Sequence, residues 1–175
     1  DLETSRRAQY CIRVIEQNTK LGLSATASRL LAERHPPGAF ETLFAYLPFV
    51  DESWVEDEIR HSLKKLDLVD GVALPLVVHA LTDREPKRRA VAAWILGASA
   101  NAQQRSKAAT ALSDSSSEVR YLAAAAQLAA HDAQAVPVLI GLLNPDSPEL
   151  AQRAEDLLAR LAGEARRQRV GLVEH

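Results

Sequence analysis

The feature that most constrains the fold of this chain is a polar turn that returns with a nearly constant period. Asp83, Asp114 and Asp146 occupy the same place in three such turns and lie 31 and 32 residues apart. In each unit an apolar stretch precedes the turn and an alanine-rich stretch follows it. A period of this length, with two amphipathic stretches per unit, is typical of stacked helix pairs. The sequence therefore predicts a helical repeat protein.

The residues of these turns suit the ends of helices. Asp, Ser and Asn side chains accept hydrogen bonds from the unpaired N–H groups at a helix N-terminus. Proline is tolerated in the first turn, where its missing N–H group costs nothing. Glu118 and Glu149 then place negative charge near the positive end of a helix dipole. Each turn is expected to end one helix and begin the next.

The spacing of apolar residues also predicts helices. In the segment 51–66, one face carries Val55, Ile59, Leu63 and Leu66. Further helices are expected at 24–34 and 39–47, and Leu139 and Leu143 are expected to be interior. No stretch alternates apolar and polar residues with a period of two, so no sheet is predicted.

The chain is interpreted as a single repeat domain over residues 1–175. Irregular helices are expected in 1–36, about four helix pairs in 37–163, and a tail in 164–175. Because the chain has no Met and opens on Asp1 in a predicted helix, we expect it to be a fragment of a longer protein. Terminal repeats without caps would expose apolar surface, and this could produce a dimer.

The stretches after the turns carry a family resemblance. Asp83 and Asp114 are each followed six residues later by an arginine, Arg89 and Arg120, and then by a pair of alanines. Asp1 and Arg7 have the same spacing, whereas the last turn has only Arg153, out of phase. This pattern resembles the HEAT repeat and, more narrowly, HEAT-repeat regions of large proteins from planctomycete-type bacteria.

The resemblance implies an all-α, right-handed α-solenoid of antiparallel helix pairs. It also implies that the turn aspartates and the arginines form a hydrogen-bonded ladder between neighbouring repeats. The physical chemistry is reasonable, because a guanidinium offers five donors in a fixed plane to carboxylate or carbonyl oxygens.

Composition and charge argue against several classes of function. The 21 basic and 23 acidic residues give a net charge of -2, which argues against nucleic acid as a partner. No apolar run approaches the ~18 residues of a membrane span. The lone Cys11, the five scattered histidines and the absence of a glycine-rich loop indicate no catalytic, metal or cofactor site. The chain is therefore predicted not to be an enzyme and to need no cofactor.

Aromatic residues supply the candidates for binding. Trp54 lies roughly 125° from the centre of the apolar stripe of its helix, at about 100° per residue. Trp94 occupies a position where HEAT-like second helices usually carry a polar residue, and Tyr121 directly follows Arg120 in an alanine-rich segment. Each aromatic either forms part of a binding surface or packs over a neighbouring repeat. The candidate surface residues are Trp54, His61, Lys65, Trp94, Tyr121, Ala125, Gln152 and Asp156.

The sequence favours a non-catalytic interaction or scaffold module that binds a protein partner through the concave surface of stacked helix pairs. Two alternatives rest on fold analogy alone. HEAT-like folds occur in alkylpurine DNA glycosylases, where Trp94 and Asp57 could take the aromatic and acidic roles. They also occur in bilin lyases, which handle a tetrapyrrole chromophore. The identity of the partner and the compartment cannot be predicted from these residues.

Overall fold

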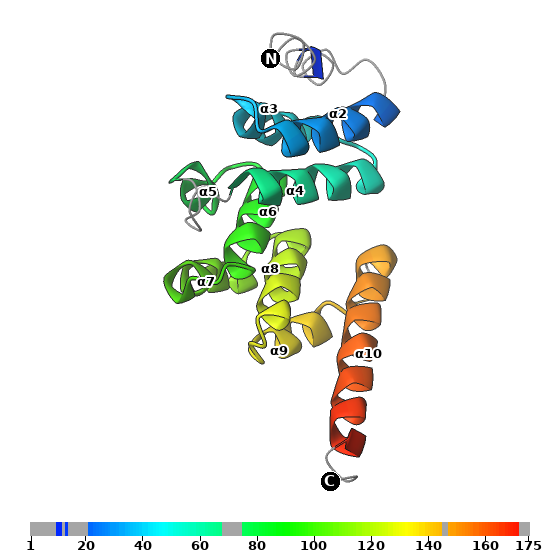
Figure 1. Cartoon of the computed structure of the whole chain (residues 1–175). Coiled ribbons are helices and arrows are strands. Elements are labelled where there is room, and N and C mark those ends of the chain that lie inside the picture. Colours follow the sequence, from blue (N-terminus) through cyan, green and yellow to red (C-terminus); the bar gives the residue numbers. More distant parts are fainter. Residues whose placement is uncertain (1–9, 12, 14–20, 68–74, 145–146, 172–175) are drawn as a thin grey trace. The chain divides into compact units, whose positions relative to one another are not determined.

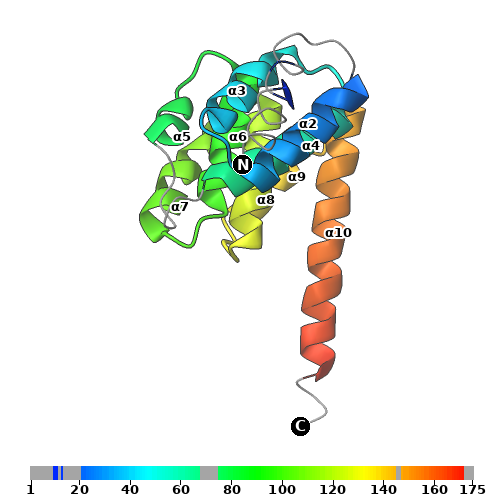
Figure 2. The same cartoon turned by 45° about the horizontal axis from the view of Figure 1, so that its top comes forward.

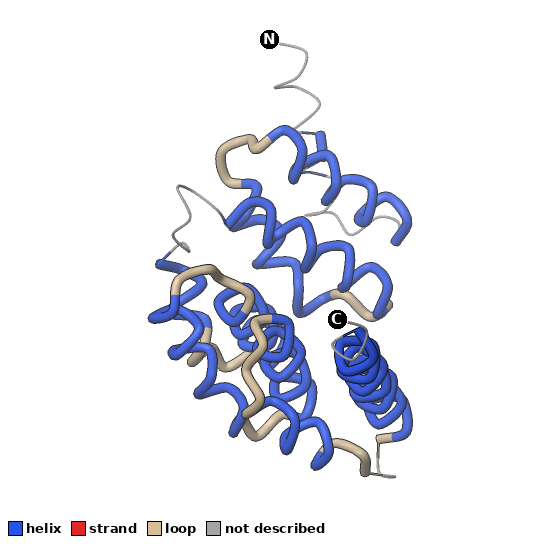
Figure 3. The backbone as a smooth tube through the Cα atoms, turned by 60° about the horizontal axis from the view of Figure 1, so that its bottom comes forward, coloured by secondary structure: helices blue, strands red, loops and turns tan. Residues whose placement is uncertain are grey.

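The computed structural model describes residues 10, 11, 13, 21–67, 75–144 and 147–171, and all regular structure in these residues is helical (Figure 3). The prediction of an all-helical chain is thus confirmed for this part of the molecule. The chain divides into two compact units, Asp1–Val91 and Ala92–His175. The boundary falls within the continuous helix α6 (Pro86–Gly97).

The first unit is built around two helices that pack against each other (Figure 1). Its elements are α2 (Leu21–Arg34), α3 (Ala39–Tyr46), the 3-10 turn η1 (Leu47–Phe49), α4 (Ser53–Asp67), α5 (Pro75–Ala80) and the start of α6. α4 contacts both α2 and α3. The face predicted for α4 is confirmed, because Val55, Ile59 and Leu63 are fully buried and Leu66 is nearly so.

The break between α2 and α3 follows from local backbone chemistry. His35 ends α2 with a φ of 47°, and Gly38 precedes α3 with a φ of 80°. Glycine adopts this left-handed conformation without steric cost, whereas a residue with a Cβ rarely does. The two prolines between them lack the N–H groups that would continue the first helix. The predicted stop at residues 35–38 is therefore present.

The second unit is organised around α8 (Ser117–Ala129). The other elements are the end of α6, α7 (Ala102–Ala109), the 3-10 turn η2 (Thr110–Ser113), α9 (Ala135–Gly141) and α10 (Pro148–Gly171). α8 contacts α7, η2, α9 and α10. Three of its alanines and its Gln127 are buried, as are Val119 and Leu122. Small side chains on α8 allow close approach, and a Cβ built on Gly97 would lie 2.8 Å from the Cβ of Ala126.

The prediction that Leu143 is interior is wrong. Leu139 is fully buried, but Leu143 is 44% exposed, and Leu142 is buried instead. α9 ends at Gly141 with Leu142 as its C-cap. The four-residue interval from Leu139 to Leu143 therefore runs past the end of the helix. The helix ends two residues earlier than the periodicity requires.

The end assigned to a tail is helical as far as the structure describes it. α10 continues from Pro148 to Gly171, and its second half extends past α8 and α9 (Figure 2). Residues 164–171 are rich in Arg, Gln, Glu and Ala, which have high helix propensity. Gly163 costs about 1 kcal/mol relative to Ala but does not stop the helix. Residues 172–175 lie outside the described part of the chain.

Candidate interaction surface

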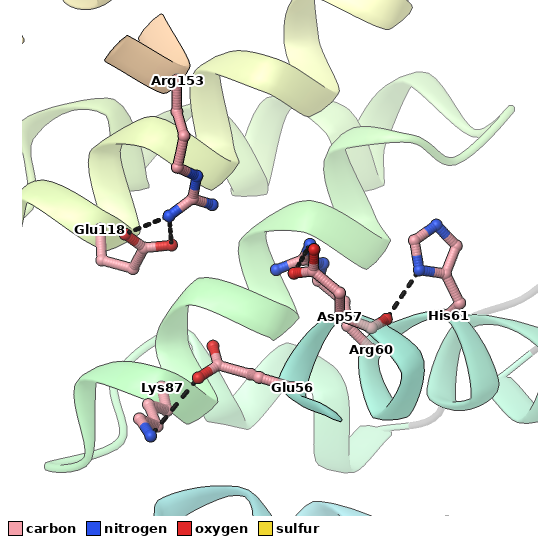
Figure 4. A network of polar contacts seen from close by, with 7 residues as sticks. All are labelled: Glu56, Asp57, Arg60, His61, Lys87, Glu118 and Arg153. Carbon is pink, nitrogen blue, oxygen red and sulfur yellow. Dashed lines mark hydrogen bonds and ion pairs between the residues drawn. The ribbon is translucent and has the colours of Figure 1, made fainter. Parts of the chain in front are cut away.

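Three of the candidate residues lie on one face of α4. Trp54, His61 and Lys65 are exposed, and their spacing of seven and four residues places them on one side of the helix. His61 Nδ1 lies 2.7 Å from the carbonyl oxygen of Asp57 (Figure 4). Because a carbonyl oxygen can only accept, Nδ1 carries the proton and donates it. This bond fixes the imidazole ring against its own helix.

Trp54 is the residue that folding explains least. It is 52% exposed, while Val55, Ile59 and Leu63 on the opposite side of α4 are fully buried. The core of the first unit is therefore complete without the indole. An exposed tryptophan contributes little to folding, but it can bury a large apolar area when a partner binds.

A second exposed aromatic residue, Phe49, lies five residues before Trp54 and was not among the predicted site residues. It is 65% exposed at the end of η1, and the next residue, Val50, is buried. The apolar stripe of α3 ends at Leu47, and Phe49 does not continue it. That break in spacing is the signal that could have identified Phe49 from the sequence.

An ion pair joins α2 to the same face of α4. Arg29 Nη2 donates to Glu58 Oε2 at 2.6 Å. This hydrogen bond is the main cause that lowers the pKa of Glu58, with the charges of Arg29, His61 and Lys65 adding to it. The same bond raises the pKa of Arg29. α2 also exposes Leu23 and Leu30, so apolar surface is present on both helices.

Tyr121 does not lie on an exposed surface. Its side chain is 8% exposed, and the guanidinium carbon of Arg153 lies 4.4 Å from the ring centroid. Arg153 Nη1 also donates to both carboxylate oxygens of Glu118, at 3.0 and 3.1 Å (Figure 4). Cation–π and ion-pair contacts together hold α10 against α8. Tyr121 is thus a packing residue, the alternative that the sequence left open.

The other candidates in the second unit are less exposed or locally bonded. Trp94 and Ala125 are half-buried. Gln152 is exposed and donates from Nε2 to Asp156 Oδ1 at 3.0 Å, one helical turn further along α10. Trp94, Ala125 and Gln152 therefore do not form an exposed aromatic cluster.

The predicted ladder arginines bond to the turns that precede their own helices. Arg89 Nη1 donates to the carbonyl of Asp83 at 2.9 Å, and Arg120 Nη1 donates to that of Asp114 at 2.7 Å. Each aspartate accepts a backbone N–H two residues later through Oδ1. Asp1 and Arg7 lie outside the described residues. We call this pairing of a turn carbonyl with an arginine six residues later an arginine clamp.

A third arginine clamp was missed because its turn residue is a serine. Arg105 Nη1 donates to the carbonyls of Ser99 and Ala100, both at 2.8 Å. Ser99 Oγ accepts the backbone N–H of Asn101, as the aspartates do in the other turns. The clamps precede or begin α6, α7 and α8, so they recur at successive helices rather than once per pair.

The described residues contain no group of three or more His, Cys, Asp or Glu side chains placed to hold a metal ion. Cys11 is buried, and burial raises the pKa of its thiol. Within the same described part, no helix combines the length and the apolar character needed to cross a bilayer. No protein-family model matches the chain, and no curated protein matches it.

Proposed function

We propose that this chain is a non-catalytic protein-interaction module of the HEAT-like type, and that it binds a protein partner through the exposed side of α2 and α4. The observation that carries the proposal is the half-exposed Trp54 on a helix whose core residues are fully buried without it. Tryptophan is strongly enriched among residues that dominate binding energy.

Three further features support this proposal. Phe49, Leu23 and Leu30 add exposed apolar area to the same unit. The Arg29–Glu58 pair joins α2 to α4, so Leu23, Leu30 and Trp54 are carried by packed helices rather than by a loop. Preorganised surfaces lose less conformational entropy on binding. The arginine clamps and alanine-rich helices support the HEAT-like assignment.

The test compares capture of partners by three forms of the immobilised chain. A Phe49→Ala/Trp54→Ala variant removes the aromatic side chains, and an Ile140→Ala/Leu143→Ala variant removes exposed apolar side chains from the second unit as a matched control. Circular dichroism and the urea midpoint establish that all three forms are folded. Proteins captured from a lysate of the source organism are identified, purified and titrated against each form.

We expect one protein to bind the parent and the control variant and to lose at least tenfold in affinity for the aromatic variant, because truncating a binding hot spot typically costs about 2 kcal/mol or more. Equal affinity for all three forms would contradict the surface on α2 and α4 and would favour a spacer role.

A further inference from the structure

Phe49 and Trp54, both exposed, flank two exposed carboxylates in the sequence. Asp51 and Glu52 lie between Phe49 and Trp54 in the sequence, and both are exposed. Val50 and Val55 are buried on either side of them and anchor this segment to the core. The Glu52 carbonyl accepts the backbone N–H groups of Val55 and Glu56, which starts α4. We call residues 49–54 the aromatic end of α4.

The other carboxylates of α4 already have cationic partners. Glu56 pairs with Lys87 at 3.4 Å, and Asp57 pairs with Arg60 at 2.5 Å (Figure 4). Glu58 pairs with Arg29. Among the residues that the structure describes, no cation forms an ion pair with Asp51 or Glu52. Lys87 Nζ also donates to the carbonyl of Val50, but its ion pair is with Glu56. Within the described residues, the carboxylates of Asp51 and Glu52 therefore have no cationic partner.

The helix dipole explains part of this arrangement. Acidic residues before a helix are stabilised by its positive end, so Asp51 and Glu52 are favourable there for folding alone. The dipole does not explain why Phe49 and Trp54, the most exposed aromatic residues of the first unit after position 20, lie at the same end. Exposed aromatic rings beside unpaired carboxylates form a surface that is complementary to a cation on an apolar stem.

We propose that the aromatic end of α4 binds a basic segment of the partner protein, in which a Lys or Arg side chain lies over Trp54 and its charge lies near Asp51 and Glu52. Arginine fits this surface well, because a guanidinium stacks on aromatic rings and also donates to carboxylates. The proposal rests on the proposed function, since it names the chemistry of the segment that the interaction surface recognises.

The test uses Trp54 as its own reporter. The chain has two tryptophans, so a Trp94→Phe form leaves Trp54 as the sole indole. The probe is a blocked peptide with two lysines and two arginines around a leucine. Matched peptides carry glutamines or glutamates in place of the four cations. Binding is measured from the emission of Trp54 at low and at physiological salt.

We expect the basic peptide to bind saturably and to bind more weakly at higher salt. Neither of the matched peptides should bind. An Asp51→Asn/Glu52→Gln variant should raise the Kd by roughly fivefold, the sum expected for two exposed charge pairs. A Glu149→Gln/Glu155→Gln variant changes the net charge equally on α10 and should leave the Kd unchanged.

Equal binding of the basic peptide by both charge variants, or binding of the glutamate peptide, would overturn the proposal. So would an absence of peptide binding by a chain that still captures its partner through Phe49 and Trp54. That last result would agree with the proposed interaction surface and would contradict only the proposal that its ligand is a basic segment. Loss of both peptide binding and the aromatic-dependent capture would overturn the proposed function as well.

Discussion

At position 97, the absence of a Cβ decides how closely two helices approach. Gly97 is the last residue of α6, and an added methyl group would lie 2.8 Å from the Cβ of Ala126 on α8 and 3.7 Å from that of Ala108 on α7. Contacts below 3 Å between carbon atoms require a shift of backbone, since neither alanine has a side chain that can rotate away. The packing of the second unit therefore depends on this glycine.

Gly97→Ala should lower the free energy of unfolding by about 1–2 kcal/mol. Overpacking costs about 1–3 kcal/mol, and the better helix propensity of alanine offsets less than 1 kcal/mol at a helix end. Urea denaturation measures the difference. Gly141→Ala is the matched control, because nothing lies within 4 Å of the added methyl group. A stability loss as large in the control would contradict the packing explanation.

Single residues also show what the sequence could and could not predict. The angular position of Trp54 predicts exposure correctly, since only its own helix has to be known. The burial of Tyr121 depends on Arg153, which lies 32 residues later and covers the ring from another helix. No local pattern contains that contact. Phe49 could have been identified from the end of the apolar stripe, but its exposure depends on how η1 turns.

At the scale of elements, the arginine clamp explains how α6, α7 and α8 begin. One guanidinium nitrogen bridges two successive carbonyls in each case, and these are the groups that a turn leaves without a backbone partner. The spacing of six residues is visible in the sequence for Asp83 and Asp114. Ser99 performs the same role with a hydroxyl, and a search for aspartate alone does not find it.

Arg105→Ala should destabilise the chain by about 1–2 kcal/mol, because two hydrogen bonds from a charged donor are lost. Arg105→Lys should recover part of this loss, since an ammonium can reach one carbonyl but does not match the planar pair. Thermal or urea unfolding measures both variants, with the exposed Arg84→Ala as control. If the lysine variant were as stable as the parent, the bridging geometry would not matter.

The Arg29–Glu58 pair between α2 and α4 should make stability depend on pH. The pKa of Glu58 is lower in the folded chain than its ordinary value. The stabilising contribution is therefore complete above the unfolded pKa, near 4.3, and is lost as the pH falls through the folded pKa. Unfolding of the parent and of Glu58→Gln should differ at pH 7 and converge once the pH has fallen through the lowered pKa of Glu58 in the folded chain.

The difference should also shrink at high salt, because Arg29 is exposed and its charge is screened. Glu33→Gln on α2 serves as a control at an exposed carboxylate. A difference that stays constant from pH 7 to pH 3 would show that the side-chain change, and not the charge of Glu58, is responsible.

At the scale of the whole molecule, burial is distributed unevenly along the chain. α8 has buried side chains on most of its surface, whereas no described side chain of α10 after Ala154 is buried. The sequence predicts that both segments are helical, since Leu and Ala recur with helical spacing in each. It does not predict how far α10 extends beyond its neighbours, because the same apolar spacing occurs in packed and in unpacked turns.

Hydrogen exchange of the intact chain should reproduce this distribution. Amides of α8 should exchange most slowly, because their opening requires loss of the core of the second unit. Amides of α10 after residue 158 should exchange fastest among the described helices, since short helical stretches without packing are marginal in water. Mass spectrometry of peptides from residues 117–129 and 159–171 gives the comparison. Equal protection in both would contradict the packing described for α10.

The arginine clamp joins groups only six residues apart in the sequence. This short separation bears on how such a chain can lengthen during evolution. A gene duplication that copies one turn and its helices copies the guanidinium and both carbonyls together, so the new unit has its clamp from the start. Only the apolar faces then have to fit their neighbours, and the small side chains of a helix such as α8 make that requirement easier to meet. Helix number can therefore change while the contact that begins helices such as α6, α7 and α8 is inherited intact.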